Sequence, residues 1–222
     1  MEQTTRIALN EIPFEKLEKA GIKKDFVDRM ENQERVDFLN GYRSAKLYTV
    51  NAKINGEDFR IPAKIRLQKA EDGAVNVKVH PIQRLNIPDE YMGHAFTKDE
   101  KMALLDHRNL GKTLELTGRN GKTDSYYLAI DQKTNELIPL RTKAIKIPDS
   151  IKGATLSDKQ KKDLAVGKKV AVEGMKGKNG KAFSASLQIN AANRNIAFSD
   201  FKQDLKEDQK NDKTKAVKPK KN

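Results

Sequence analysis

The chain has no cysteine and no tryptophan among its 222 residues. Without cysteine it can form no disulfide, no thiolate metal ligand and no cysteine nucleophile. It also lacks a run of about 18 apolar residues, the length that crosses a membrane as a helix. The first residues, "MEQTTRIALNEIP", lack the basic segment and apolar core of a secretory signal. We therefore expect a cytoplasmic protein with no membrane partner.

Catalytic motifs are missing as well: there is no Gly-x-Ser-x-Gly, no His-Glu-x-x-His and no Gly-x-Gly-x-x-Gly. The histidines His80, His94 and His107 stand at no metal-ligand spacing, so we assign them structural roles. Asp89 and Asp149 each follow Ile-Pro and could serve as paired carboxylates for acid–base chemistry. An aspartate after proline more readily accepts local backbone hydrogen bonds at a turn. We predict no enzyme, no cofactor, no metal and no small-molecule substrate.

The stretch "GRNGKT", residues 118–123, ends as a phosphate-binding P-loop ends. A P-loop needs a glycine five residues before its Gly-Lys pair, and Leu116 stands there instead. The segments on both sides alternate apolar and polar residues, which indicates two half-buried strands. Asn120-Gly121 between them predicts a hairpin with a type I′ turn, because both residues tolerate positive φ.

The same dipeptide occurs at Asn55-Gly56 and at Asn179-Gly180, which suggests a repeat. Residues 85–140 and 141–198 align over most of their length, and each begins Ile-Pro-Asp. Thr97 with Glu100, and Ser157 with Gln160, predict capping boxes that open helices over 98–108 and 158–166.

Gly111 and Gly167 are expected to end these two helices. A hairpin and a third strand should follow in each copy, the third strands lying at 135–140 and 195–198.

The N-terminal residues 1–84 form a looser copy with two helical stretches. One places Phe14, Leu17 and Ala20 on a face, and the next uses Val27, Met30, Val36 and Leu39. Strands are expected at 46–54, 57–67 and 74–81. The predicted fold class is α+β, with repeated units of a helix plus a three-stranded antiparallel meander and Asn-Gly hairpins.

The net charge of +13 is concentrated in the C-terminal third. Residues 141–198 hold 13 lysines and arginines against four acidic residues, whereas residues 85–140 hold seven against nine. Such a cluster attracts polyanions by counterion release. We expect the hairpin lysines to share one small surface around Phe183, a ring that either stacks on a base or, as we favour, faces the core. The candidate nucleic-acid-binding residues are Lys168, Lys169, Lys176, Lys178, Lys181 and Arg194.

Two other interpretations of this charge stay open. The lysines can simply decorate a solvated hairpin, or they can contact an acidic protein partner or an anionic surface. After Asp200 the only large apolar residues are Phe201, Leu205 and Val217. Residues 199–222 therefore predict a disordered basic tail, with a frayed helix over 199–208 as its one element.

Several segments resemble an uncharacterised repeat domain of gut-bacterial mobile elements. They are Ile147–Gly153, Gly167–Met175, Gly180–Phe183 and, most specifically, "LQIN" at Leu187–Asn190. Ile12–Ile22 and Leu39–Gly41 resemble a companion domain of unknown function that usually precedes it. The resemblance spans about residues 10–198. It implies an origin on conjugative transposons, plasmids or phages, where such domains are sometimes fused to topoisomerase-like domains, and it implies no catalytic residues.

The functional hypothesis from sequence is thus a non-enzymatic accessory protein of a mobile element, which binds nucleic acid through the third repeat and the tail. The alternative is a protein-interaction module, an adaptor or inhibitor of a host or competitor factor, that uses sheet edges or hairpin tips. Salt dependence separates the two, because phosphate binding weakens steeply with salt and an apolar contact does not.

Overall fold

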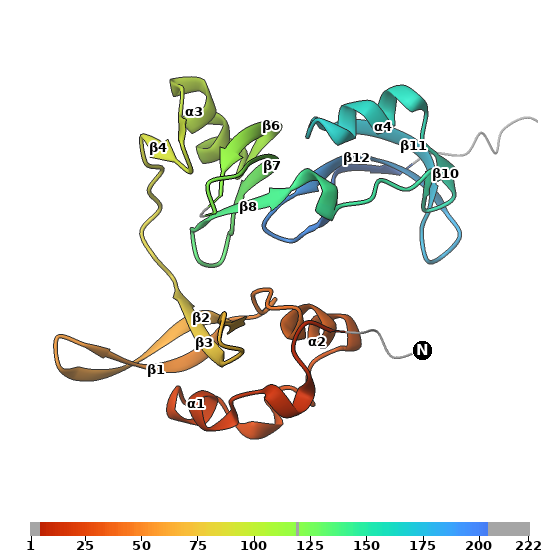
Figure 1. Ribbon diagram of the computed structural model, residues 1–222. Helices are drawn as coiled ribbons and strands as arrows, with labels where there is room; N and C mark the ends of the chain where they lie inside the picture. The colour runs from red at the N-terminus through yellow and green to blue at the C-terminus, as the bar shows by residue number, and fades with distance from the viewer. Residues whose placement is uncertain (1–4, 119, 204–222) are drawn as a thin grey trace, which may run out of the picture. The chain divides into compact units, whose positions relative to one another are not determined.

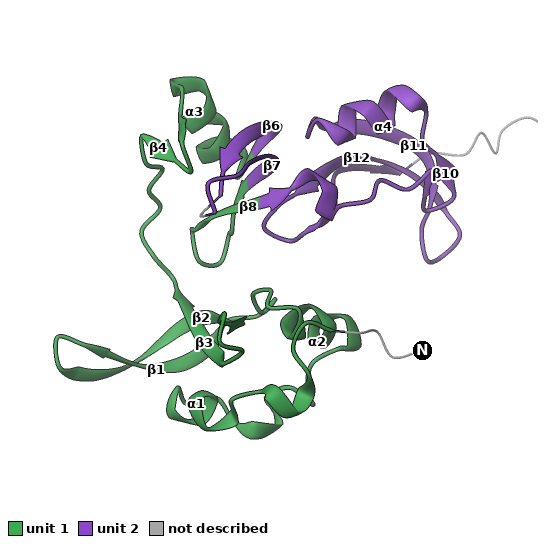
Figure 2. Ribbon diagram, viewed as in Figure 1, with its two compact units in different colours: residues 1–109, 129–139 green, residues 110–128, 140–222 purple. Residues whose placement is uncertain are grey.

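A computed structural model describes residues 5–118 and 120–203. It confirms an α+β protein built from short helices and small three-stranded sheets (Figure 1). The chain divides into two compact units, residues 1–109 with 129–139 and residues 110–128 with 140–222 (Figure 2). This division follows spatial contacts and cuts the second repeat, so it differs from the boundaries at 84/85 and 140/141 that the sequence repeat predicts.

The N-terminal region combines short helices with a sheet of order β1-β2-β3. The hydrophobic core beneath them includes Leu17, Phe38, Ile65 and Leu67, each fully buried. The second predicted helical stretch is only partly right, because Val27 and Met30 enter this core from irregular backbone. The elements are η1 Leu9–Glu11, α1 Phe14–Lys19, η2 Lys24–Phe26, α2 Asn32–Leu39, β1 Tyr48–Ile54, β2 Glu57–Lys69 and β3 Val75–Pro81.

The second and third repeats share one order of elements: a two-stranded ribbon, a helix and a three-stranded sheet. The second comprises β4 Glu90–Tyr91, β5 His94–Ala95, α3 Lys98–His107, β6 Asn109–Thr117, β7 Thr123–Ile130 and β8 Leu137–Arg141. After η3 Thr142–Ala144, the third comprises β9 Ser150–Ile151, β10 Ala154–Thr155, α4 Asp158–Ala165, β11 Val170–Lys176, β12 Ala182–Asn190 and β13 Asn195–Gln203.

Both predicted capping boxes are present at the helix starts. The Glu100 amide donates to Thr97 Oγ1 and the Gln160 amide donates to Ser157 Oγ, each at 3.2 Å, and the side chains of both N3 residues reciprocate. Gly167 ends α4 as predicted, with φ +87° and hydrogen bonds typical of a Schellman motif. Gly111 does not end α3; Arg108 does so in the left-handed conformation, and Gly111 lies inside β6.

The Asn-Gly turns are of two kinds. Asn55 and Gly56 both have positive φ, +51° and +88°, as a type I′ turn requires. In the third repeat Gly180 has φ +74° but Asn179 does not have positive φ, and Gly177 and Lys181 close a three-residue loop. The predicted type I′ turn is therefore wrong at Asn179-Gly180, where the pattern is a turn followed by a glycine bulge. The hairpin at Asn120-Gly121 has the same hydrogen bonds, Gly118 N to Lys122 O and Gly121 N to Gly118 O.

The last strand is longer than predicted. Residues 199–203, expected to begin a frayed helix and a disordered tail, instead extend β13 and pair with β12 as far as Phe183–Gln203. The period of four between Phe201 and Leu205 suggested a helix, but pairing along β12 determines the conformation of these residues. The remainder of the predicted tail, residues 204–222, lies outside the described residues.

Candidate nucleic-acid interface

The third repeat places its sheet with one face against α4 and with β11 and β13 as its two edges. Along β12 the side chains of Ala185, Leu187 and Ile189 are buried, whereas those of Ser184, Ser186 and Gln188 alternate onto the other face. Leu164 of α4 packs on the buried set together with Met175. The sheet therefore has an apolar face and an outer face of small polar side chains.

The candidate lysines do not share one surface, because β11 separates them. Lys168 and Lys169 precede the strand, whereas Lys176 ends it and Lys178 and Lys181 lie in the following loop. Seven residues of extended chain span about 20 Å. The sequence prediction treated nearness along the chain as nearness in space, and the extended strand makes that wrong.

The two lysines before β11 are already paired with carboxylates. Lys168 Nζ lies 3.2 Å from Asp163 Oδ1, and Lys169 Nζ lies 3.3 Å from Asp200 Oδ2. Hydrogen bonds from Ser186 and Lys169 lower the pKa of Asp200, so this carboxylate stays ionised. The charge of these lysines is thus largely balanced locally.

Five lysines gather at the opposite end of the sheet, and we call them the tip lysines: Lys152, Lys176, Lys178, Lys181 and Lys202. The Lys176 amide donates to the Lys152 carbonyl at 2.8 Å, which brings the β9–β10 turn beside the end of β11. Lys176 of β11 pairs with Ala182 of β12, and Lys202 of β13 pairs with Ser184, two residues further along β12. Within the part of the chain that the structure describes, none of the five ammonium groups makes a hydrogen bond or an ion pair.

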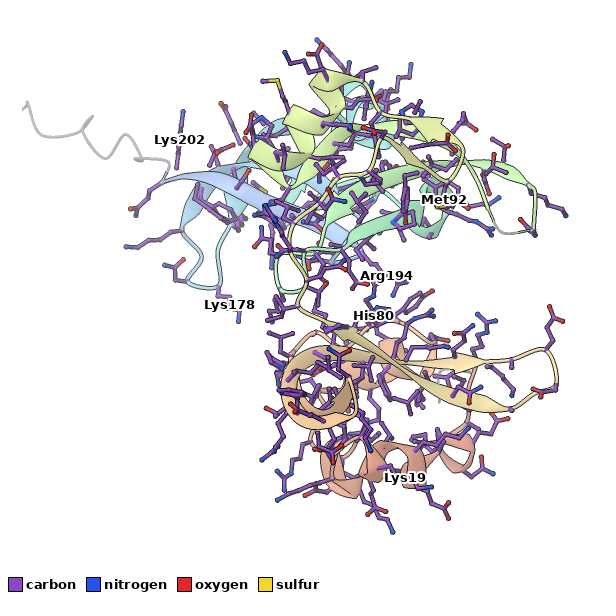
Figure 3. All side chains as sticks on the ribbon, turned by 90° about the vertical axis from the view of Figure 1, so that its left-hand side faces the viewer. Lys19, His80, Met92, Lys178, Arg194 and Lys202 are labelled. Carbon is purple, nitrogen blue, oxygen red and sulfur yellow. The ribbon has the colours of Figure 1, made fainter. Side chains whose placement is uncertain are left out.

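Arg194 does not belong to this cluster. It has φ +54° and lies in the turn between β12 and β13, at the end of the sheet away from the hairpin loop. Figure 3 shows Lys178 and Lys202 on one side of the third repeat, with Arg194 away from both. Sequence reasoning missed Lys152 and Lys202, because only the ribbon turn and the strand pairing bring them to the tip.

Phe183 packs partly buried against the core of the third repeat, as we favoured, together with Phe198. The exposed ring is Phe201, with 66% of its surface accessible. Its centroid lies 6.0 Å from that of Phe183 and 6.4 Å from that of Phe198. Phe201 thus contacts both other rings and is the exposed member of the three.

The second repeat has the same loop but different chemistry around it. Matching hydrogen bonds align Gly118–Lys122 with Gly177–Lys181, which puts Asp124 at the position of Phe183. Asp124 Oδ2 lies 2.7 Å from Lys143 Nζ and 3.7 Å from Arg141 Nε. The hydrogen bond from Lys143 lowers the pKa of Asp124. Here the cations beside the hairpin are neutralised.

Asp89 and Asp149 do not act as the sequence suggested. Their carboxylates pair with Lys101 and Lys161 of the following helices, while their backbone carbonyls accept from Phe96 and Leu156 at 2.8 Å. The local amides therefore donate to the main-chain carbonyls of Asp89 and Asp149, and not to their carboxylates. The equivalence of the two ion pairs marks them as part of the repeat skeleton.

The most buried charges lie elsewhere, within one compact unit. Lys64 on β2 contacts Asp131, whose side chain also accepts from the Lys133 amide at 2.9 Å. Burial raises the pKa of Asp131, but hydrogen bonds from Lys64 and from two backbone amides outweigh it and hold the pKa below its ordinary value. Nearby, Glu136 contacts His80 Nδ1 at 3.0 Å and Arg43 at 3.2 Å.

We assign this buried cluster to structure. Arg66 Nε donates to His80 Nε2 at 3.3 Å, so both nitrogens of His80 are engaged in hydrogen bonds. His94 Nε2 lies 3.0 Å from the capping residue Glu100. No group of three His, Asp or Glu side chains that could hold a metal occurs in residues 5–118 and 120–203. No helix within these ranges has the length and apolar composition that a membrane span requires.

Two family models match the chain. Residues 7–89 match "Protein of unknown function (DUF4099)", and residues 148–200 match "Protein of unknown function (DUF3945)". No match was found among curated proteins, and none among solved structures. The chain is thus similar to a pair of uncharacterised domains, one at the N-terminal region and one at the third repeat, with residues 90–147 between them.

Proposed function

We propose that the chain is a non-enzymatic accessory protein of a mobile genetic element that binds nucleic acid without sequence preference through the tip lysines. One observation carries the proposal: five lysines converge on one end of a small sheet, and within the described residues none of them has a carboxylate partner. The mobile-element context rests on the sequence resemblance. The two family matches agree with the pair of uncharacterised domains in that resemblance.

The physical argument is counterion release. A phosphate backbone carries condensed cations, and each phosphate that a lysine neutralises sets cations free. Lysines that already face a carboxylate, such as Lys168 with Asp163, gain little from a phosphate and must first lose their partner. The tip lysines face solvent and have no such cost, so they supply the phosphate contacts.

Salt-dependent binding tests the proposal with two charge-matched triple variants. Lys176→Gln, Lys178→Gln and Lys181→Gln together remove three tip charges. On a 30-residue single strand this should lower the slope of log K against log salt by about 2, at about 0.7 per phosphate contact. Fluorescence anisotropy between about 50 and 200 mM salt gives the slope.

The control variant removes the same charge from lysines that have carboxylate partners. Lys161, Lys168 and Lys169, each replaced by glutamine, should leave the slope within a few tenths of the wild-type value. Equal slopes for the wild type and the tip variant, or equal losses in both variants, would refute binding through the tip.

A protein-interaction module is the second candidate, and two side chains of α3 favour it. Met102 and Leu105 are 50% and 47% exposed and lie three residues apart, on one helical face. Replacing both with glutamate should abolish capture of a protein partner from nuclease-treated host extract if that face binds one. Nucleic-acid binding through the tip lysines would be unaffected by the same change.

A further inference from the structure

The exposed ring of Phe201 lies on an edge strand. β13 pairs with β12 on one side only, and Phe201 is the most exposed of the large apolar side chains in the described residues. An exposed aromatic ring at a sheet edge invites association with other chains, and native proteins usually cover or charge such edges. Its exposure therefore calls for an explanation beyond packing.

A β-bulge in the pairing of β12 with β13 determines the direction of the Phe201 side chain. The pairing of β12 with β13 shifts register between Ser184 and Ser186, where Asp200 adopts φ +50°. The Asp200 carboxylate is held at 3.3 Å by Lys169 and at 3.2 Å by the Ser199 hydroxyl. Bulges of this kind redirect the next side chain. Here the redirected side chain is Phe201, whose ring contacts those of Phe183 and Phe198.

Positive charge borders the ring. Lys202 follows Phe201 directly and pairs with Ser184 of the outer face, so ring and ammonium group flank the β13 edge from its two sides. Lys178 and Lys181 lie in the β11–β12 loop at the same end of the sheet. A strand of nucleic acid that runs along this edge can place phosphates on the lysines and a base on the ring.

We propose that Phe201 is a base-stacking platform, and that the tip therefore prefers single-stranded over double-stranded nucleic acid. This inference rests on the proposed function, because it requires the tip lysines to hold a backbone. Every base has a π-face, so stacking on an aromatic ring tolerates any sequence. In a duplex the bases stack on one another, and an exposed ring at a sheet edge cannot reach their faces.

Three probes of equal length separate stacking from charge: a 30-residue oligothymidylate, an abasic strand with the same phosphates, and a 30-base-pair duplex. Phe201→Ala should weaken oligothymidylate binding about 5- to 150-fold, the range that alanine substitution gives for a stacking ring. Binding of the abasic strand and of the duplex should change less than twofold. Phe201→Tyr keeps the ring and should keep the affinity.

The control is Phe59→Ala, which removes another exposed phenylalanine, 43% accessible, from β2. It should change no affinity, and thermal melts of all variants confirm that they fold. Equal loss on the abasic strand, or no loss on oligothymidylate, overturns the stacking site while tip binding stands. A wild type that binds none of the three probes at low salt overturns tip binding and stacking together.

Discussion

Replacing Lys64 with methionine should destabilise the protein far more than the same change at Lys69 of the same strand. The Lys64 and Asp131 side chains are 7% and 3% exposed, so neither charge is screened by water. Lys69 pairs with Glu11, and those side chains are 30% and 35% exposed. The two variants remove the same group from β2, in each case from an ion pair with a carboxylate, and the pairs differ chiefly in their burial.

The magnitude follows from the charge left behind. Methionine fills the space of the lysine stem but leaves the Asp131 carboxylate with only the Lys133 and Thr134 amides. Breaking a buried ion pair by removing one partner costs about 3 to 5 kcal/mol. An exposed pair such as Lys69 with Glu11 contributes about 0 to 1 kcal/mol. The double variant with Asp131→Asn removes both charges, and its asparagine oxygen can still accept from the two amides, so it should recover a large part of the loss.

Urea unfolding followed by circular dichroism measures these free energies, and a double-mutant cycle isolates the pair. A positive coupling of about 2 to 4 kcal/mol between Lys64 and Asp131 is expected. Hydrogen exchange of the β2 amides should report the same loss locally. Two outcomes would show that the ion pair is not buried as the structure has it. One is that Lys64→Met costs no more stability than Lys69→Met. The other is that the costs of Lys64→Met and Asp131→Asn add without coupling.

Two further predictions concern the turn and the pH dependence. Gly180→Val forces a β-branched side chain to φ +74° and should cost about 1 to 3 kcal/mol in a thermal melt, whereas Lys178→Val in the same loop should cost little. Asp131 and Glu136 have pKa values lowered on folding, so their stabilising effect is present above about pH 4 and is lost as pH falls below it. Stability curves against pH should show this acid loss, and Lys64→Met should flatten it; an identical pH profile in the variant would contradict the assignment.

Local signals in the sequence predicted local structure well. The capping boxes at Thr97 and Ser157 involve residues three apart, so the chain fixes them before any tertiary contact forms. The hairpins were predicted for the same reason, but the predicted turn type is right at Asn55-Gly56 and wrong at Asn179-Gly180. Asn55-Gly56 and Asn179-Gly180 are the same dipeptide, yet Gly177 and Lys181 close the second loop one residue further out. The turn follows the strand register, which is set by pairing along the whole strand.

Features that depend on distant residues could not be predicted. Lys64 and Asp131 are 67 residues apart in the chain, and nothing in either neighbourhood signals the other. Lys202 reaches the tip only because β13 pairs with β12, and the sequence pattern around Phe201 favoured a helix. The charge count singled out the third repeat, but the position of each lysine along an extended strand determines which charges lie close together.

A comparison of the two repeats supports the proposal that the charge pattern, and not the shared skeleton, binds a polyanion. They share the capped helix, the loop and the Asp–Lys pair at their entrance. At the hairpin they differ, because Asp124 holds Lys143 where Phe183 turns into the core of the third repeat. With its pKa lowered, Asp124 keeps that charge neutralised across the physiological range. A site built from the skeleton would occur in both repeats, whereas of these two repeats, within the described residues, only the third has lysines without carboxylate partners beside an exposed ring.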